Sequence, residues 1–187
     1  MEEEPPFLTG QLLLAMPGIG DPRFEKAVIA MCTHDEDGAL GIGLGRIVPR
    51  LGFHDLLKQL DIDPGVAPDV AIHQGGPVEP TRGFILHSLD WGGQESIDVA
   101  GRWGLSATLD ILRSIAEGRG PSRWVAALGY AGWGAGQIES EMGRHGWFVT
   151  PCTDELLYDV HVDTRWSAAF RSAGVDPRLL TSHSGNA

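Results

Sequence analysis

A glycine-rich stretch in the C-terminal third most constrains how this chain can fold. It runs from Trp124 to Met142 and reads WVAALGYAGWGAGQIESEM. Its apolar beginning is typical of a buried strand, and Ile138 and Met142 have the spacing of one helix face. Between these parts, glycines occupy positions 129, 132, 134 and 136. Because glycine tolerates positive φ and close approach of other groups, we expect a tight bend from strand to helix, and a site beside it.

Length and composition indicate one globular domain. The chain has 187 residues, of which 42% are apolar, enough for a single core. No stretch approaches the roughly 20 apolar residues of a membrane span, and the acidic N-terminus differs from a signal peptide. We therefore expect a cytoplasmic protein with no membrane partner. Cys32 and Cys152 form no CxxC pair, and we expect both as buried apolar side chains.

The charge balance disfavours direct nucleic-acid binding. Fourteen basic residues against twenty-five acidic ones give a formal net charge of −11. Such a charge repels phosphate over long range, and the arginines are scattered rather than clustered. We also find no helix-turn-helix pattern with a basic second helix.

The order of predicted elements indicates a mixed α+β fold rather than regular βαβ units. We expect strands at 11–16, 27–33, 39–46, 70–73, 83–88, 96–100, 124–129 and 147–150. We expect helices at 53–60, from Ser106 or Thr108 to Gly118, from the glycine run to Met142, at 153–158, and from Thr164 to Gly174. A single domain would then span 8–180, with loose tails at 1–7 and 181–187.

Several well-known motifs are absent. The glycine run lacks the GxGxxG of dinucleotide-binding folds, because Gln137 stands where the third glycine belongs. There is no Walker lysine and no GxSxG nucleophile elbow. A structural turn is therefore the simpler interpretation of the run. Within it, Trp133 is flanked by glycines that could leave its ring exposed in a cleft.

A second group of residues surrounds the sequence HQGGP at 73–77. If the strands on either side pair with each other, His73 and His87 lie at matching depths. A carboxylate from Glu139 or Glu141 could then complete a metal site or an acid–base pair. The simpler alternative is two histidines with structural hydrogen bonds.

Taken together, the motifs resemble the YqgE/AlgH family of small bacterial proteins. They are QLLLAMP at 11–17, DPRF at 21–24, HQGGPV at 73–78, GFILH at 83–87 and LGYAGWGAGQIESE at 128–141. The resemblance implies an α+β fold with a bent, partly barrel-like, mainly antiparallel sheet wrapped by helices. It implies no catalytic set, only a label of transcriptional regulator. In the Gly43-Leu44-Gly45-Arg46 segment the chain departs from the family, which usually has Asn before the Arg.

These observations favour a binding module over an enzyme. We expect a cleft for a small molecule or a protein partner, with an indirect regulatory role at most, and the sequence names no cofactor. The predicted cleft residues are His73, Gly75, Gly76, Pro77, His87, Tyr130, Trp133, Gln137 and Glu141. The alternatives are a metal-dependent or acid–base enzyme using His73, His87 and Glu141, and a transcriptional regulator.

Overall fold

A computed structural model describes residues 7–18, 22–93, 95–144 and 146–180. Its strands are β1 (Gln11–Ala15), β2 (Val28–Asp35), β3 (Gly38–Gly43), β4 (Ile47–Gly52), β5 (Ala71–Gln74), β6 (Val78–His87), β7 (Ile97–Val99), β8 (Trp103–Ser106), β9 (Trp124–Gly134) and β10 (Trp147–Pro151). Its α-helices are α1 (Phe53–Gln59), α2 (Leu109–Ala116), α3 (Gln137–Gly143) and α4 (Val162–Ser172). Short helical turns lie at Pro22–Phe24, Glu155–Asp159 and Pro177–Leu179. The predicted tails, apart from Phe7, fall outside the described residues.

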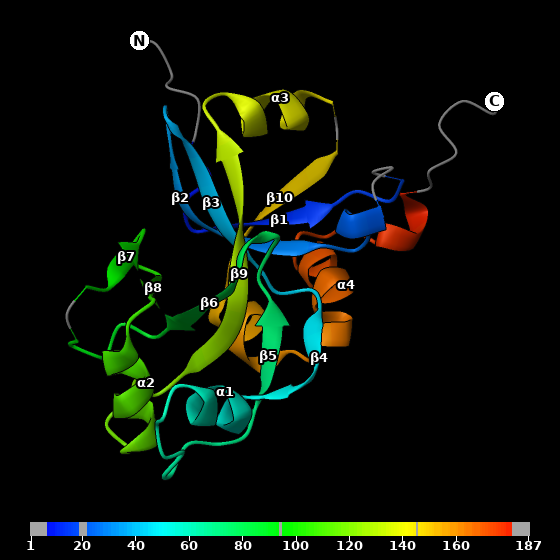
Figure 1. The fold of residues 1–187 in the computed structure, drawn as a ribbon. Helices are drawn as coiled ribbons and strands as arrows, with labels where there is room; N and C mark the ends of the chain where they lie inside the picture. Colours follow the sequence, from blue (N-terminus) through cyan, green and yellow to red (C-terminus); the bar gives the residue numbers. More distant parts are fainter. Residues whose placement is uncertain (1–6, 19–21, 94, 145, 181–187) are drawn as a thin grey trace, which may run out of the picture.

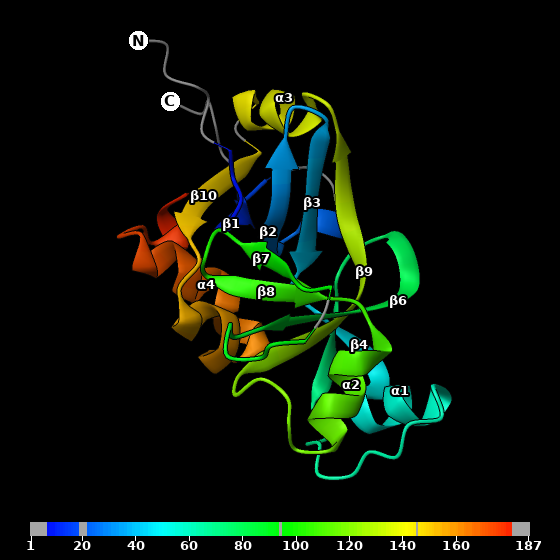
Figure 2. The ribbon, with the colours of Figure 1, turned by 90° about the vertical axis from the view of Figure 1, so that its left-hand side faces the viewer.

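Strand β9 joins all parts of the sheet. Its first part pairs with β5 on one edge and β6 on the other, and its last four residues pair with β3. The sheet has ten strands in the order β10-β1-β2-β3-β9-β6-β8-β7, with β4 and β5 branching from β9. In Figure 1, β9 runs from the group around α1 and α2 to the group beneath α3. Figure 2 shows β7 and β8 lying across the direction of β2 and β3, so the sheet is strongly curled. The predicted α+β class with a bent, mainly antiparallel sheet is confirmed.

The predicted turn from strand to helix lies only at the last glycine of the run, Gly136, and not at the earlier three. Residues 129–134 continue β9 as a strand, which aligns Gly134 with Gly38 of β3. A side chain at Gly38 would bring its Cβ within 2.4 Å of the Trp133 carbonyl oxygen, so the strands need glycine to approach this closely. The turn comes later, at Gly136, whose φ of 73° precedes α3.

Two strands, β4 and β8, were not predicted. β4 contains a proline and is largely exposed, so it lacks the alternation that marks a half-buried strand. β8 is a short segment buried at every position, with no alternation either. Helix α4 begins at Val162 rather than Thr164, because His161 caps it by accepting a hydrogen bond from the Asp163 amide.

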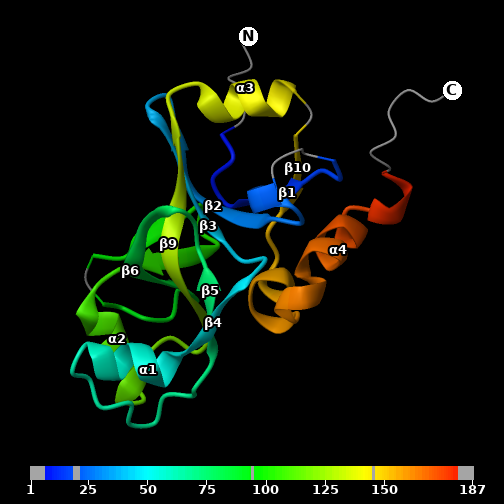
Figure 3. The same ribbon diagram turned by 45° about the vertical axis from the view of Figure 1, so that its right-hand side comes forward.

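Three clusters of apolar side chains stabilise the curled sheet. One fills the space between the sheet and α4, a second lies under α1 and α2, and a third lies under α3. Figure 3 shows α4 on one side of the sheet, with α1 and α2 at the end opposite α3. Cys32 and Cys152 are free thiols buried in the first cluster, as predicted. In the described part of the chain, no helix is long and apolar enough to cross a membrane.

Candidate functional site

The sequence HQGGP places a backbone junction beside β9. The Gly43 amide donates to the Gly75 carbonyl (2.7 Å), and the Gly75 amide donates to the Leu128 carbonyl (2.8 Å). A Cβ at Gly75 would lie 2.1 Å from the Gly129 oxygen, and one at Gly76 would lie 2.1 Å from the Tyr130 carbonyl carbon. The end of β3 and the end of β5 therefore meet along the same edge of β9, at a separation that only glycine permits.

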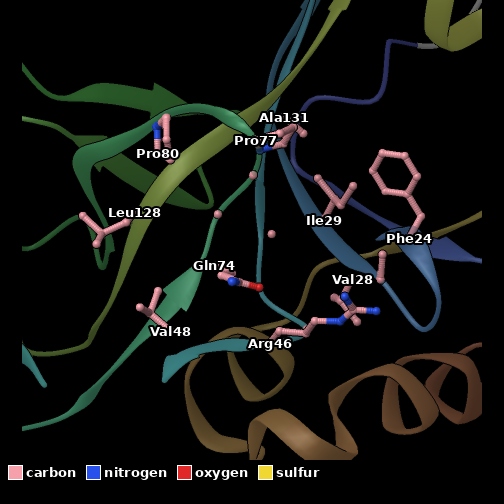
Figure 4. Close-up of a pocket in the computed structure, with 15 residues that line it drawn as sticks. Phe24, Val28, Ile29, Arg46, Val48, Gln74, Pro77, Pro80, Leu128 and Ala131 are labelled. Carbon is pink, nitrogen blue, oxygen red and sulfur yellow. The ribbon is translucent and has the colours of Figure 1, made fainter. Parts of the chain in front are cut away.

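A cavity of about 490 Å³ opens at this junction. Its lining is mostly apolar and comes from the start of β2 and the segment before it, from the end of β3 through to β4, from the end of β5 through to the start of β6, and from β9. The lining residues are Phe24, Ala27, Val28, Ile29, Gly43, Gly45, Arg46, Val48, Gln74, Gly75, Gly76, Pro77, Pro80, Leu128 and Ala131. In Figure 4, Arg46 and Gln74 lie along the lower edge, and Pro77, Ile29 and Ala131 lie along the upper edge.

Arg46 brings a positive charge to this cavity. Its Nη2 donates to the carbonyls of Glu25 (3.0 Å) and Pro22 (3.3 Å), which holds the exposed side chain beside the cavity. The remaining guanidinium donors can bind an anion. Next to it, Gly45 lacks the Asn side chain that the resemblance leads one to expect. A Cβ there would come within 3.1 Å of the Lys26 carbonyl oxygen.

The nine predicted cleft residues do not form one cleft. Gly75, Gly76 and Pro77 line the cavity, whereas Tyr130 and Trp133 line a second, shallower hollow beside the β2–β3 hairpin. Their grouping had assumed that the chain turns before Trp133, whereas β9 continues as a strand to Gly134 and separates them.

The expected exposure of Trp133 is wrong, since its ring is only 8% exposed. The indole Nε1 donates to Glu141 (2.8 Å), and Gln137 accepts the Gly134 amide (2.9 Å). Gln137 and Glu141 therefore both fasten α3 to the end of β9. The neighbouring Glu139 accepts a hydrogen bond from His34 Nε2 (2.5 Å).

His73 is a buried structural histidine. Its Nδ1 donates to the Ala126 carbonyl (3.0 Å), and its Nε2 accepts from Nη1 of Arg165 (3.0 Å). Burial, together with the Arg165 charge, lowers the pKa of His73 to about 4. At neutral pH the imidazole is therefore neutral and already has a partner at each nitrogen.

Arg165 was missed by the sequence reasoning. It is 2% exposed and donates to the carbonyls of Leu44, Leu156, Leu157 and Val160 as well as to His73. Burial lowers the pKa of Arg165 to about 10. The sequence did contain a sign that Arg165 is buried, because it lies four residues before the inward-facing Ala169 and so shares its helix face.

His87 lies on the opposite face of the sheet from His73. On β9, His73 aligns with Ala127 and His87 aligns with Trp124, three positions away. Side chains alternate along a strand, so an odd separation puts the two imidazoles on opposite faces. β5 and β6 also pair with opposite edges of β9 rather than with each other. The structure therefore does not bring His73, His87 and Glu141 to a common site.

The fold defines a single-domain α+β protein with a curled antiparallel sheet and a cavity beside its longest strand. The chain belongs to the AlgH-like family, whose model matches residues 12–178. A UPF0301 protein of Rhizorhabdus wittichii is 63% identical over 99% of this chain and 100% of its own length. A UPF0301 protein of Sphingopyxis alaskensis is 58% identical, with both chains covered completely.

Solved structures show the same fold. The solution structure of the AlgH protein from Pseudomonas aeruginosa matches with a TM-score of 0.80 and 36% identity over the whole of both chains. A crystal structure of a Corynebacterium diphtheriae protein matches with a TM-score of 0.76 and 20% identity, covering 97% of this chain and 95% of that one. At that identity the second match supports the fold alone.

Proposed function

We propose that the protein is a cytoplasmic small-molecule-binding module whose ligand occupies the cavity at the β3–β5 junction. The observation that carries the proposal is a cavity of about 490 Å³ with apolar walls and a guanidinium at one edge. Small-molecule sites commonly occupy roughly 300–1,000 Å³ and combine apolar walls with a few polar groups. Any regulatory effect would be indirect, through the ligand.

The lining favours a compact apolar ligand that carries an anionic group. Phe24, Ile29 and Leu128 offer apolar contact, and Arg46 offers guanidinium donors suited to a carboxylate or phosphate. A charged hydrogen bond of this kind contributes about 1.5–3 kcal/mol. Because the whole chain carries a net charge of −11, this local cation would be the main reason for an anion to bind.

A fluorescent apolar anion, 8-anilinonaphthalene-1-sulfonate, tests the proposal by titration at neutral pH. The native protein should bind the dye, and benzoate should displace it more effectively than benzyl alcohol. Arg46→Met keeps much of the side-chain length but removes the charge, so it should weaken dye binding roughly 10–100-fold. Val48→Trp should fill the cavity and abolish binding.

Arg119→Met is the matched control, because Arg119 is exposed and pairs with Glu117 away from the cavity. It should bind the dye like the native protein. Circular dichroism should show that each variant keeps its fold. Equal binding to all three variants, or no binding to the native protein, would contradict the proposal.

A further inference from the structure

A chain of three polar side chains lies on β6, β8 and the residue before β7, apart from the cavity. His87 Nε2 is 2.8 Å from the Ser106 hydroxyl oxygen, which is 2.6 Å from the Ser96 hydroxyl oxygen. The pairing of Ile97 with Leu105 places the preceding Ser96 opposite Ser106. None of these residues lines the cavity, and β7 and β8 are best seen in Figure 2.

The contact of His87 Nδ1 with a backbone carbonyl fixes which group donates in each hydrogen bond of this three-residue network. His87 Nδ1 lies 2.9 Å from the Ser88 carbonyl oxygen, which can only accept, so Nδ1 carries the proton. In the neutral ring Nε2 must then accept, and the Ser106 hydroxyl donates to it. Ser106 has one proton, so it can only accept from Ser96. The Ser96 proton therefore points inward and its lone pairs point outward.

The surroundings hold the imidazole neutral and in place. His87 is 1% exposed, and the Trp91 ring packs against it edge-on with centroids 5.6 Å apart. Gly104 makes room for it, since a Cβ there would lie 2.4 Å from the imidazole Cε1. Burial lowers the pKa of His87 below 6.5, and the hydrogen bond to the Ser88 carbonyl and the Asp90 charge oppose this shift only in part.

Burial alone accounts for the contact between His87 and Ser106, because buried polar groups need partners. It does not account for Ser96, which is exposed and could bond to water instead. A hydroxyl that gives its proton toward a neutral imidazole and faces solvent with its lone pairs has the arrangement of an activated nucleophile.

We propose that Ser96 is a nucleophile that takes an acyl group from a carboxylic ester, with Ser106 and His87 as its proton relay. The Ser96 oxygen bonds to the ester carbonyl carbon while its proton passes to Ser106 and the Ser106 proton passes to His87 Nε2. The carbon–oxygen bond to the alcohol then breaks. The imidazolium gives its proton back to the Ser106 oxygen, and the Ser106 hydroxyl passes a proton to the leaving alcohol. Water releases the acid by the same steps, so all atoms balance and no redox partner is needed.

Labelling of the full-length protein with a fluorophosphonate, followed by peptide mapping, tests which residue reacts. We expect the label on Ser96, and hydrolysis of p-nitrophenyl acetate above background that Ser96→Ala abolishes. Ser140→Ala is the matched control, since Ser140 is an exposed serine on α3 with no such relay, and it should react like the native protein. Label at another residue, no label, or no turnover above that of Ser96→Ala would overturn the proposal.

Ser106→Ala separates the relay from a structural role. It leaves Ser96 in place, so the labelling rate should fall about 100-fold or more while the thermal unfolding transition stays cooperative. In the native protein the rate should rise with pH along one titration with a midpoint below 6.5, and Ser106→Ala should lose that dependence. An unchanged rate or an unchanged pH profile in a folded Ser106→Ala would overturn the relay.

Discussion

At the scale of single residues, two buried histidines differ in the groups that their Nε2 atoms contact. His73 and His87 are both buried strand histidines with the same tautomer, because each donates from Nδ1 to a backbone carbonyl. Their Nε2 atoms meet different partners. That of His73 faces the fixed charge of Arg165, whereas that of His87 faces a hydroxyl that continues toward the surface. The first is therefore a structural acceptor, and the second can act as a base.

His73 should make folding stability depend on pH. Its pKa is lowered from 6.5 to about 4 in the folded chain, so between these values the unfolded chain binds a proton that the folded chain does not. Stability therefore falls as pH falls through this window, by about 2 kcal/mol between pH 7 and pH 5. Urea unfolding at both pH values measures the change.

His87 contributes in the same direction, so the His73 share must be isolated by substitution. His73→Gln keeps an acceptor for Arg165 but does not titrate. Its loss of stability from pH 7 to pH 5 should be smaller than that of the native protein by about 2 kcal/mol. Equal losses in both proteins would show that His73 does not carry the effect.

At the scale of elements, one arginine holds α4 to the sheet. Arg165 reaches the end of β3 through the Leu44 carbonyl. It reaches the turn at 155–159 through the carbonyls of Leu156 and Leu157, and the residue after that turn through the Val160 carbonyl. The carbonyls at the end of a helical turn carry partial negative charge, so they suit a buried guanidinium. No carboxylate pairs with Arg165 among the described residues. The backbone carbonyls therefore stabilise its buried positive charge.

Arg165→Met should destabilise the fold by roughly 3–5 kcal/mol, because it leaves several buried carbonyls and His73 without their donor. Arg165→Lys should recover only part of the lost stability, since one ammonium group cannot donate to all the acceptors that the planar guanidinium reaches. Chemical denaturation measures both. Arg171→Met, an exposed change on the same helix, should stay within about 0.5 kcal/mol of the native protein. A small effect of Arg165→Met would contradict this account.

Sequence patterns predict elements here better than they predict which elements meet. The apolar periodicity of Phe53, Leu56, Leu57 and Leu60 indicates the buried face of α1, and all of these but Leu60 are buried. The glycines beside Trp133 misled, because Gly132 and Gly134 have neither a positive φ nor a close neighbour, yet in sequence they look the same as glycines that bend the chain. The loop at 75–77, a predicted part of the cleft, lines the cavity, and Arg46, which was not among the predicted cleft residues, lines it too. The contacts of Arg46 with Pro22 and Glu25 depend on tertiary packing, so sequence patterns do not show them.

At the scale of the whole molecule, the curled sheet encloses its own core on one side and relies on α4 to close it. The cluster beneath α4 includes both cysteines, Phe170 and Trp103. It draws side chains from the first strand to the last helix. Such a core cannot open at one place without separating elements far apart in sequence, so we expect it to unfold as a unit.

The two thiols should report this cooperative unfolding. Burial raises the pKa of Cys32 and of Cys152 to about 12, so neither should react with a disulfide reagent such as dithionitrobenzoate in the native protein at pH 8. Both should react together as denaturant unfolds the chain, along the same transition seen by circular dichroism. One thiol reacting well before the other would show that the core opens in parts.

The pairing of β9 also has a consequence for how the protein is made. β3, β5 and β6 each pair with β9, which begins at Trp124, and β1 pairs with β10 at Trp147–Pro151. These pairings cannot form until the later strand has been synthesised. A nascent chain that ends before residue 124 can pair β1 with β2, β2 with β3, β4 with β5, and β8 with β6 and β7, but it cannot join these groups into one sheet. For about the first two thirds of synthesis these separate groups therefore keep free strand edges, which are open to chaperones and to other nascent chains.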